Sequence, residues 1–313
     1  MQAVRFHTYG DADVLAVEDV AIPTPGPDQV RLRVAGTTYN PVEGAIRAGF
    51  MTQAIPVALP HTPGVEVSGT VDALGEGVND LAVGDAVVGF LPLDGDGASS
   101  DYALAPAAVL TTAPTTVPLA DAAALPLVGL TAWQALFDHG GLTAGQRVLI
   151  NGAGGSVGGY AVQLARGAGA HVIATASPRD AARVAELGAD EVLDHTAAPV
   201  AAQLDEPVDL LVNLANVDAD TLAALAARVR DGGVVVTTTV RVPAPSDPAR
   251  GVRGVDLFVR SDADQLAHLV RLVDGGALRV EVAERVGLAD VADVHARAGA
   301  GALRGRVVVI PTA

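Results

Sequence analysis

A glycine-rich run at residues 150–159 is the clearest candidate for chemistry in this sequence. It reads Ile-Asn-Gly-Ala-Gly-Gly-Ser-Val-Gly-Gly and connects an apolar, strand-like segment to a helix-like segment rich in small residues. Residues without bulk at such a turn let backbone N–H groups and the positive end of the helix approach a pyrophosphate. The expected dinucleotide contacts are Gly152, Ala153, Gly154, Gly155, Ser156, Val157 and Gly158, with Ala153 where the usual pattern has its first glycine.

A tight turn without any ligand would also be rich in glycine, so the context of the run has to decide. The run follows a strand-like segment, opens a helix and precedes a second strand at the distance typical of a βαβ unit. This context favours nucleotide binding.

The residues after the second strand bear on which nicotinamide cofactor would bind. An NAD-specific site places Asp or Glu about 20 residues beyond the loop, where it bonds the ribose 2′-hydroxyl. Here Ser177 lies 19 residues after Gly158, and Arg179 and Arg183 follow it. Ser177 could donate to a 2′-phosphate and the arginines could supply charge, which favours NADPH. The two arginines, at i and i+4, would equally suit an ordinary solvated helix face.

Two absences exclude other chemistry. Lysine and cysteine do not occur, so all 20 positive charges are arginine. Schiff-base and P-loop lysines, thiolate nucleophiles, cysteine zinc sites and disulfides are therefore impossible. The remaining zinc ligands to consider are seven histidines without ligand-like spacing, so we expect no metal: His7, His61, His139, His171, His195, His268 and His295.

Charge and hydropathy limit the partners. The formal net charge of −16 argues against a nucleic-acid partner, which would need a basic surface. The mean hydropathy is high, at +0.37, but no stretch reaches 18 apolar residues without a charge or a break. The nearest, Ala122 to Phe137, contains Pro126 and Gly129 and is expected to be a buried helical segment. Because Met1 to Gly10 lacks an apolar signal core, we expect a cytoplasmic protein without membrane association.

Apolar periodicity changes character near residue 120. Before it, short alternating runs lie between Gly, Pro and Asp clusters and predict a β-rich domain, as at Gln29–Val34, Val65–Val71 and Asp85–Phe90. After Leu125, continuous apolar strands alternate with helices, which predicts a parallel sheet covered on both faces. The expected fold class is α/β, with a doubly wound Rossmann sheet of about six strands beside the β-rich domain.

The expected elements define three segments of chain. The strands are Arg147–Asn151, His171–Thr175, Glu191–Leu193, Val208–Asn213, Val234–Val240, Val255–Arg260 and, in the tail, Arg306–Ile310. The helices are Val157–Gly167, Arg179–Leu187, Ala219–Val229, Asp264–Val273 and Val291–Ala298. We expect a first domain at 1–121, the Rossmann domain at 122–261, and a return segment at 262–313 that folds back onto the first domain.

Several motifs resemble the zinc-free quinone oxidoreductase branch, which includes zeta-crystallin-like proteins, of the medium-chain dehydrogenase/reductase superfamily. The resemblance runs over nearly the whole length. The matching segments are Asn40–Glu43, Ile46–Gly49, Pro63–Gly69, Gly84–Val87, Leu125–Ala132, Leu187–Asp190 and Gly305–Val308. Zinc-dependent members of the superfamily hold metal with Cys and a Gly-His-Glu motif, whereas Val65 precedes Glu66 here.

This resemblance implies a GroES-like first domain completed by the C-terminal tail, with the active site in a cleft beside the Rossmann domain. It implies NADPH-dependent, metal-free, two-electron reduction of a quinone or an α,β-unsaturated carbonyl compound. It also implies a homodimer that pairs Rossmann sheets edge to edge. Arg306 stands where relatives have lysine, and we count it among the cofactor contacts.

Tyr39 and Asn40 are the candidate catalytic residues. Asn40 could donate to the substrate oxygen, and the phenol of Tyr39 could donate or stack. Equally, Asn40 would suit a helix N-cap or turn before Pro41, and Tyr39 would suit plain packing. Family members often carry Tyr or Lys at the position of Ala45, so this chain lacks that donor and its substrate class is open.

Further candidates follow from the resemblance and from the rule that ligands lie beyond the carboxyl ends of parallel strands. The substrate-pocket candidates are Phe50, Leu91, Trp133 and Phe258. The additional cofactor contacts expected are Thr131, Asn213, Thr238, Thr239, Phe258 and Val259.

Two other functions are compatible with these patterns. An enoyl-thioester or polyketide-type reductase shares the fold but would need a wider, partly basic channel, which the acidic composition disfavours. A weakly active NADPH-binding sensor or structural protein is kept open by the missing donor at Ala45. An assay of NADPH binding with several acceptors would separate the three.

Overall fold

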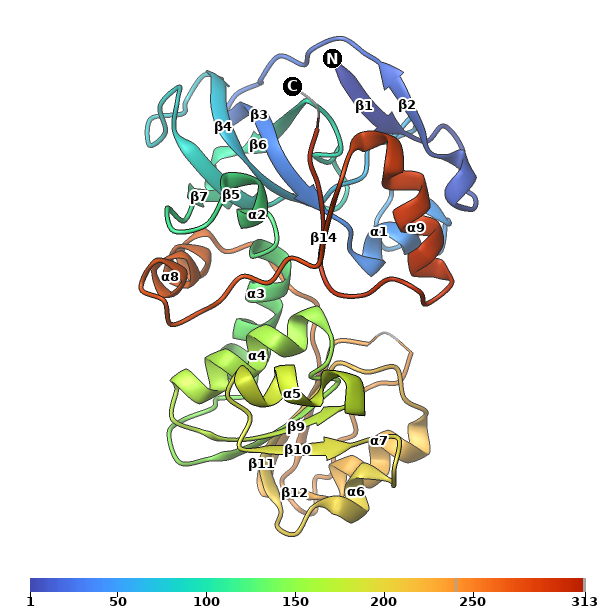
Figure 1. Cartoon of the computed structure of the whole chain (residues 1–313), viewed down its shortest axis with the longest axis vertical. Helices are drawn as coiled ribbons and strands as arrows, with labels where there is room; N and C mark the ends of the chain where they lie inside the picture. Colours follow the sequence, from blue (N-terminus) through green and yellow to red (C-terminus); the bar gives the residue numbers. More distant parts are fainter. Residues whose placement is uncertain (240, 312–313) are drawn as a thin grey trace. The chain divides into compact units, whose positions relative to one another are not determined.

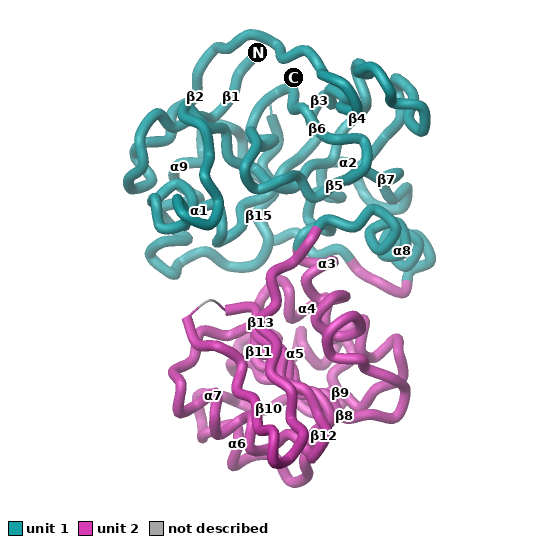
Figure 2. The backbone as a smooth tube through the Cα atoms, turned by 180° about the vertical axis from the view of Figure 1, so that it is seen from behind, with its two compact units in different colours: residues 1–127, 261–276, 280–313 teal, residues 128–260, 277–279 magenta. Residues whose placement is uncertain are grey.

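The computed structural model describes residues 1–239 and 241–311. The chain forms two compact units, shown in different colours in Figure 2. Unit 1 comprises Met1–Leu127, Ser261–Gly276 and Val280–Ala313; unit 2 comprises Val128–Arg260 and Ala277–Arg279. The two units therefore divide after residues 127 and 260, whereas the boundaries expected from the sequence lie after residues 121 and 261.

Unit 1 contains a β-hairpin and a seven-stranded sheet. The hairpin strands are β1 (Gln2–Arg5) and β2 (Ala16–Asp19). The sheet strands are β3 (Gln29–Thr38), β4 (Glu66–Leu74), β5 (Ala86–Phe90), β6 (Tyr102–Pro106), β7 (Leu110–Thr112), β14 (Glu284–Val286) and β15 (Val307–Val309). Their order is β14-β15-β3-β4-β5-β7, with β6 also paired to β3. The tail strands β14 and β15 therefore complete a sheet begun by the first hundred residues (Figure 1).

Alternating apolar residues build the core of this sheet. Val30, Leu32 and Val34 of β3 all point inward and pack with Val67 of β4 and Val87 of β5. The residues between them on β3 are exposed or half-buried. This period of two is the pattern from which the sequence predicted strands, and it places one face of each strand in the core.

The helices of unit 1 are short, apart from one in the tail. They are α1 (Pro41–Arg47), α2 (Leu119–Ala122), α8 (Ala263–Asp274) and α9 (Val291–Gly299), with 3₁₀ turns at Ala12–Val14, Ala107–Val109 and Leu288–Asp290. Pro41 at the first position gives α1 a pre-set backbone angle. Asn40 before it is extended and makes no side-chain capping bond, so its amide group is available elsewhere. Helix α9 packs on α1.

Unit 2 contains a six-stranded parallel sheet, which confirms the predicted doubly wound fold. Its strands are β8 (Arg147–Asn151), β9 (His171–Ala176), β10 (Glu191–Asp194), β11 (Val208–Asn213), β12 (Val229–Thr237) and β13 (Arg253–Asp256). Their order is β10-β9-β8-β11-β12-β13. The register pairs Asn213 with Asn151 on one side and with Thr237 on the other, so the carboxyl ends of these strands lie side by side.

Helices cover this sheet. They are α4 (Ser156–Gly167), α5 (Pro178–Glu186), α6 (Val200–Gln203) and α7 (Ala219–Ala226). Helix α3 (Pro126–Trp133), which begins in unit 1, continues as a π-helical segment Gln134–His139 that packs on β12. Helix α4 packs on β8 and β9, α5 on β9 and β10, and α7 on β12. Figure 1 shows α4 and α5 on one face of the sheet and α6 and α7 on the other.

One helical stretch among the described residues, Leu119–His139, is long and apolar enough to cross a membrane by composition. Its apolar window is 78% buried, as in a core helix. The structure breaks it into α2, α3 and the π-helical segment, which together span and extend beyond the segment Ala122 to Phe137 predicted as a buried helix.

The last two strands predicted for the Rossmann sheet differ from those observed. Strand β12 begins at Val229 rather than Val234, and the predicted end at Val240 lies outside the described residues. Strand β13 ends at Asp256, so Phe258 lies in the following loop rather than in the strand. The last sheet bond here joins the Leu257 N–H to the Thr237 carbonyl, after which the chain leaves the sheet.

Candidate functional site

The glycine loop of unit 2 has the geometry of a phosphate-binding turn. Gly152 follows β8 with φ of +96°, a left-handed conformation that favours glycine. A Cβ atom on Gly158 would lie 2.5 Å from the Cα of Ala153, so only glycine lets α4 approach the strand this closely. A Cβ atom on Gly155 would meet only the Gly152 carbonyl oxygen, at 3.4 Å. The start of α4 beside exposed Gly155 is therefore open, as close approach of a pyrophosphate would require.

The other residues of the loop divide between support and exposure. Ala153 is fully buried, and its N–H donates to the carbonyl of Thr175 on the neighbouring strand at 3.1 Å. Gly154, Ser156 and Val157 are half-buried. Ala153 thus anchors the loop to the sheet, and Gly158 is buried against it. The accessible surface of the predicted contacts belongs to Gly152, Gly154, Gly155, Ser156 and Val157.

A row of neutral polar side chains crosses the carboxyl ends of four neighbouring strands. We call Thr175, Asn151, Asn213 and Thr237 the polar row. The Thr175 hydroxyl donates to Asn151 Oδ1 at 2.9 Å, and Asn151 Nδ2 donates to Asn213 Oδ1 at 2.8 Å. Asn213 Nδ2 donates to Thr237 Oγ1 at 3.1 Å. At the other end the N–H of Gly152 donates to Thr175 Oγ1 at 2.9 Å, so the row begins at the glycine loop.

A small cavity lies at the far end of the polar row. Its volume is about 220 Å³, and its lining residues are Thr237, Thr238, Thr239, Pro243, Asp256, Leu257 and Phe258. Phe258 is 59% exposed, which is unusual for a large apolar side chain. The structure therefore brings together three of the predicted cofactor residues, Thr238, Thr239 and Phe258. Val259 follows them half-buried, and Thr131 is buried in α3.

The predicted 2′-phosphate residues gather around an acid that the sequence analysis did not select. The Ser177 hydroxyl donates to Asp180 Oδ2 at 3.0 Å, and Arg179 Nη2 donates to the same oxygen at 3.1 Å. Burial alone would raise the pKa of Asp180, but hydrogen bonds from Arg179 and Ser177 and the nearby arginine charges lower it. Arg183 Nη2 donates to the Gly154 carbonyl at 2.7 Å. The cluster borders the glycine loop, because a Cβ atom on Gly154 would lie 3.4 Å from Asp180 Oδ2.

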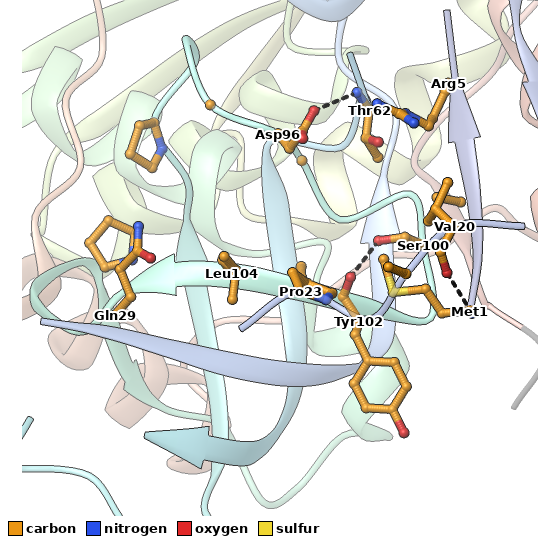
Figure 3. A pocket seen from close by; sticks show the side chains of 17 residues that line it. Met1, Arg5, Val20, Pro23, Gln29, Thr62, Asp96, Ser100, Tyr102 and Leu104 are labelled. Atoms are coloured by element: carbon orange, nitrogen blue, oxygen red, sulfur yellow. Dashed lines mark hydrogen bonds between the residues drawn. The ribbon is translucent and has the colours of Figure 1, made fainter. Parts of the chain in front are cut away.

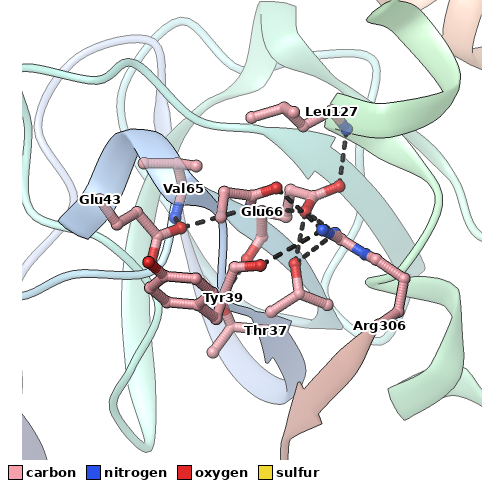
Figure 4. Close-up of polar contacts among 9 residues, drawn as sticks. Thr37, Tyr39, Glu43, Val65, Glu66, Leu127 and Arg306 are labelled. Carbon is pink, nitrogen blue, oxygen red and sulfur yellow. Dashed lines mark hydrogen bonds and ion pairs between the residues drawn. The ribbon is translucent and has the colours of Figure 1, made fainter. Parts of the chain in front are cut away.

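Unit 1 holds a cluster of charged groups in its interior (Figure 4). We call Thr38, Asn40, Glu43, Glu66 and Arg306 the ion cluster. Arg306 and Thr38 both donate to Glu66 Oε2 through short contacts, and Asn40 Nδ2 donates to it at 2.8 Å. Arg306 also donates to Asn40 Oδ1 at 2.8 Å and to Thr38 Oγ1 at 2.6 Å.

Glu66 has a further donor at its other oxygen. The N–H of Leu127 donates to Glu66 Oε1 at 2.6 Å, next to the first turn of α3. Glu66 is fully buried and Arg306 is 5% exposed, so the salt bridge between them is shielded from water. A buried ion pair of this kind depends strongly on each partner.

Glu43 adds a second carboxyl group to the ion cluster. It accepts hydrogen bonds from the N–H of Val65 at 3.1 Å and from Asn40 Nδ2 at 3.3 Å. Its pKa is raised to about 8, because burial and the neighbouring Glu66 outweigh the lowering effect of the two hydrogen bonds and of Arg306. The Glu43 side chain is therefore protonated at neutral pH.

Two more titratable groups lie beside the ion cluster. Burial raises the pKa of Tyr39 to about 12, assisted by the negative charge that Glu43 carries above its own pKa. Its ring meets that of buried His295 edge-on, with centroids 4.7 Å apart. Burial and then the charge of Arg47 lower the pKa of His295 to about 3, so this imidazole is neutral.

The structure brings the two predicted catalytic residues together, in different environments. Asn40 is buried, and its Nδ2 group donates to both Glu66 and Glu43. Tyr39 is half-buried. Arg306, predicted as a cofactor contact, joins them in unit 1 and donates to the Tyr39 carbonyl at 3.3 Å. Roles for all three toward substrate or cofactor stay predictions.

The predicted substrate-pocket residues differ in exposure. Phe50 is 84% exposed and Phe258 is 59% exposed. Leu91 is 1% exposed and belongs to the apolar core of unit 1. Trp133 is half-buried, with its ring 4.4 Å from that of Phe137. A side chain as buried as Leu91 cannot contact a substrate without rearrangement of the core.

A larger cavity of about 460 Å³ lies in unit 1 between the β1–β2 hairpin and β6 (Figure 3). Arg5, Thr62, Asp96 and Tyr102 are among its lining residues. Asp96 accepts a hydrogen bond from the N–H of Thr62 at 2.8 Å. None of the residues selected from the sequence lines this cavity.

The sequence analysis missed several residues that hold the two sites. Asn151, Thr175, Thr237 and Asp180 escaped selection in unit 2, and Glu43 was quoted only as part of a motif. The rule of ligands at strand ends would have found the first three, because each lies at or next to the last residue of its strand. The burial of Glu43 had no signal in the sequence, because it depends on β4 and the tail packing around α1.

Comparison with known proteins agrees with this architecture. One family model, described as an alcohol dehydrogenase GroES-like domain, matches residues 26–115, and another, described as a zinc-binding dehydrogenase, matches residues 187–309. A chloroplast envelope quinone oxidoreductase homolog of Arabidopsis thaliana is 33% identical over 330 residues, covering 99% of this chain and 98% of its own. The chain belongs to the quinone oxidoreductase family of the medium-chain dehydrogenases/reductases.

Solved structures extend this family assignment to the fold. The quinone oxidoreductase from Coxiella burnetii matches with a TM-score of 0.90 at 28% identity, over 99% of both chains. An NAD-dependent alcohol dehydrogenase matches with a TM-score of 0.88, also at 28% identity and over 99% of both chains. The resemblance inferred from the sequence motifs and the α/β fold class are both confirmed.

The zinc named in one family description has no suitable ligands here. The chain has no cysteine, and within residues 1–239 and 241–311 no three His, Asp or Glu side chains are placed to hold a metal ion. Glu66, next to the position where zinc-dependent members carry histidine, is bound by Arg306 instead. The residues of this quinone oxidoreductase family member therefore do not fit a zinc ion.

Proposed function

We propose that the protein is an NADPH-dependent oxidoreductase that reduces a quinone or an α,β-unsaturated carbonyl compound. The observation that carries this proposal is the glycine loop, whose open space beside Gly155 and close packing at Gly158 fit a dinucleotide pyrophosphate. The names of the relatives from Arabidopsis thaliana and Coxiella burnetii support a quinone as the acceptor.

In this proposal the bound nicotinamide supplies hydride, and the chain supplies binding and orientation. The glycine loop holds the pyrophosphate, and the residues around the cavity at Thr238, Thr239 and Phe258 orient the nicotinamide end. Val259, Thr131 and Asn213 stay proposed contacts. A quinone or enone spreads the developing negative charge onto oxygen, so we propose that no zinc takes part.

Tyr39 is the better placed of the two proposed substrate donors. Its phenol, whose pKa is raised to about 12, holds a proton throughout the physiological pH range, and its side chain is only half-buried. Asn40 would have to release Glu66 or Glu43 before its amide could donate to a substrate. We therefore propose Tyr39 as the donor and Asn40 as the residue that holds the ion cluster next to it.

The preference for NADPH rests on Ser177, Arg179 and Arg183. Asp180 opposes it, because its carboxylate accepts hydrogen bonds from Ser177 and Arg179 and would repel a 2′-phosphate. A carboxylate at this place would accept hydrogen bonds from a ribose 2′-hydroxyl, so NADH is the second candidate. We propose NADPH as the preferred cofactor, with a preference that Asp180 limits.

The function is tested by mixing the protein with NADPH or NADH and, in turn, an ortho-quinone, a 2-alkenal and a crotonyl thioester. The absorbance of the reduced nicotinamide reports turnover. Turnover of the quinone or alkenal supports the proposal. Preferred turnover of the thioester would indicate an enoyl reductase, and tight NADPH binding without turnover would indicate a sensor or structural protein.

Cofactor choice is tested by two substitutions with opposite expected effects. Asp180→Asn should raise the ratio of kcat/KM for NADPH to that for NADH, and Arg179→Ala should lower it, each about tenfold as expected for one charge-assisted hydrogen bond. Asp218→Asn is the matched control, because Asp218 caps α7 by accepting the Thr221 N–H and is remote from Arg179 in sequence. An unchanged ratio in both variants would refute this role of the cluster.

We further propose a homodimer that works in the cytoplasm without membrane association. Strand β13 is the outermost strand on its side of the unit 2 sheet, and among the described residues no further strand pairs with it, which supports the dimer. The segment that contains Ala244 and Ser246 packs along this edge and hydrogen-bonds to it, so it would belong to the interface or move aside. Light scattering of the purified protein at several concentrations would measure the oligomeric state.

A further inference from the structure

The polar row connects two places that a dinucleotide would touch with its two halves. It begins at the N–H of Gly152 in the glycine loop and ends at Thr237, which lines the cavity beside Phe258. Between them Asn151 and Asn213 are almost fully buried. Buried amide groups have a large cost when they lose a partner, so each member of the row holds the next in one orientation.

The hydrogen bonds of the row have a defined direction. Thr175 receives the Gly152 N–H and therefore donates its own proton to Asn151 Oδ1. This fixes the Asn151 amide with its Nδ2 toward Asn213 Oδ1. The Nδ2 of Asn213 then faces Thr237 Oγ1 and the Ala215 carbonyl, at 3.1 and 3.2 Å.

The row continues to the wall of the cavity. Thr237 Oγ1 lies 3.1 Å from Thr239 Oγ1. Because Thr237 already receives a hydrogen bond from Asn213, its own proton is directed to Thr239 or to the Asn213 carbonyl, 3.5 Å away. When Thr237 donates to Thr239, the Thr239 hydroxyl can donate to an acceptor in the cavity, and its orientation depends on the whole row.

Backbone contacts follow the same path. The Leu214 N–H donates to the Asn151 carbonyl at 2.8 Å, and the Thr238 N–H donates to the Asn213 carbonyl at 3.1 Å. A Cβ atom on Gly152 would lie 3.1 Å from the Ala215 nitrogen, so the glycine loop packs directly on the segment that follows β11. The loops after three neighbouring strands are thus held to one another.

We propose that Thr175, Asn151, Asn213 and Thr237 are positioning residues that couple the phosphate loop to the cavity at Thr239 and Phe258. They keep the two contact points for one cofactor at a fixed separation, without all four having to touch it. This inference rests on the proposed binding of a nicotinamide dinucleotide. Its distinctive consequence is energetic coupling between Thr175 and Thr237, which do not contact each other.

The distance between these threonines makes the coupling measurable. They lie on β9 and β12, separated by β8 and β11, so three strand spacings put them about 14 Å apart. Substitutions this far apart normally have independent effects, unless a network joins them. Valine has the shape of threonine without its hydroxyl, so Thr175→Val and Thr237→Val each cut the row at one end.

The experiment is a double-mutant cycle on kcat/KM for NADPH with an ortho-quinone acceptor. Each single variant should lose about tenfold in kcat/KM. The reason is that a buried amide loses its hydrogen-bond partner and a contact point for the cofactor is displaced. The double variant should lose clearly less than the product of the two single losses, because the second cut affects a row that is already broken. Thr175→Ser and Thr237→Ser, which retain the hydroxyl, should restore most of the activity.

Thr196→Val is the matched control, because the Thr196 hydroxyl bonds Asp194 at the surface of the same unit, outside the row. When Thr196→Val is combined with Thr237→Val, the fold-losses in kcat/KM of the two substitutions should multiply. Melting temperatures of all variants identify any that fail to fold, in which case Thr175→Ala or Thr237→Ala makes the same cut.

The outcomes separate this inference from the proposed function. Sub-multiplicative losses with rescue by serine support the coupling. Losses that multiply, or valine variants with full activity in an active protein, overturn the coupling alone. A wild-type protein that binds neither NADPH nor NADH, measured by quenching of Trp133 fluorescence and by calorimetry, overturns the proposed function together with the coupling.

Discussion

The ion cluster of unit 1 and the polar row of unit 2 both bury polar side chains, but with different chemistry. The ion cluster contains two carboxyl groups, Glu43 and Glu66, around a single guanidinium from Arg306. The polar row contains only amides and hydroxyls, such as Asn151 and Asn213, joined across neighbouring strands. The ion cluster therefore contains charged groups and a titratable proton, whereas the polar row contains only neutral groups held in fixed orientations.

This difference predicts how each region responds to change. A buried charge that loses its partner costs several kcal/mol, whereas a buried neutral group that loses a hydrogen bond costs about 1–3 kcal/mol. A cluster with a titratable carboxyl also responds to pH, whereas a row of amides and hydroxyls does not. Unit 1 should therefore be the more sensitive region to both mutation and pH.

The largest effect is expected when the cation of the ion cluster is removed. Arg306→Met keeps much of the side-chain volume but leaves the fully buried Glu66 carboxylate without its cation. We expect a loss of about 3–5 kcal/mol in the free energy of unfolding, measured with urea. Arg304→Met is the control, because Arg304 is exposed and bonds only nearby carbonyls. Equal losses in the two variants would contradict the importance of the buried pair.

The second prediction concerns the proton on Glu43. Its pKa is raised from 4.5 to about 8, so between these pH values the folded chain retains a proton that the unfolded chain has released. Raising the pH through this window therefore lowers the free energy of unfolding, by roughly 1 kcal/mol per pH unit. Glu43→Gln should remove this pH dependence. The free energy of unfolding of the variant, relative to that of the wild type, should therefore rise by about 2 kcal/mol from pH 5 to pH 7.

The measurement is urea unfolding of both proteins across pH 5 to 8, taking the difference at each pH so that other titrations cancel. A difference that stays constant with pH would show that Glu43 keeps an ordinary pKa. The polar row offers the comparison, since Asn213→Ala should give a constant difference over the same range.

The contrast between the two regions also explains which parts of the structure could be predicted from the sequence. Strands β8 and β11 match their predicted bounds, because each contains three consecutive large apolar residues ended by an asparagine. The glycine loop was predicted residue by residue, since a phosphate turn constrains consecutive positions. The polar row was predicted only at Asn213, although the same strand-end rule applies to Asn151 and Thr175.

The ion cluster was beyond sequence reasoning for a different reason. Asn40, Glu66 and Arg306 are up to 266 positions apart, and no local pattern indicates that they meet. Arg306 was assigned to the cofactor from the position of a lysine in relatives, and the structure places it beside Glu66. Leu91 and Phe50 are both large apolar residues, so residue type does not distinguish them. Only the packing of the fold places Leu91 in the core and leaves Phe50 exposed.

A smaller effect is expected from the middle of the polar row. Asn213→Ala leaves Asn151 Nδ2 without its acceptor and removes the nearer of the two N–H donors to Thr237 Oγ1. We expect a loss of about 1–2 kcal/mol in the free energy of unfolding. Asn79→Ala controls for loss of an asparagine, because Asn79 is exposed and bonds only the nearby Gly77 carbonyl. A loss of unfolding free energy as large as that of Arg306→Met would show that neutral and charged buried groups are equally sensitive to the loss of a partner here.

The smallest effect on stability is expected at Gly155 of the glycine loop, where binding and folding can be separated. Gly155 has φ of −83°, and a Cβ atom there would meet only the Gly152 oxygen at 3.4 Å, so Gly155→Ala should change stability by less than about 0.5 kcal/mol. The added methyl group would fill the space proposed for the pyrophosphate and weaken NADPH binding roughly tenfold. Gly158→Ala is the contrast, because its Cβ atom would lie 2.5 Å from Ala153 and should cost about 1–3 kcal/mol of stability. Calorimetric titration with NADPH and urea unfolding measure the two quantities, and unchanged NADPH affinity in Gly155→Ala would place the pyrophosphate elsewhere.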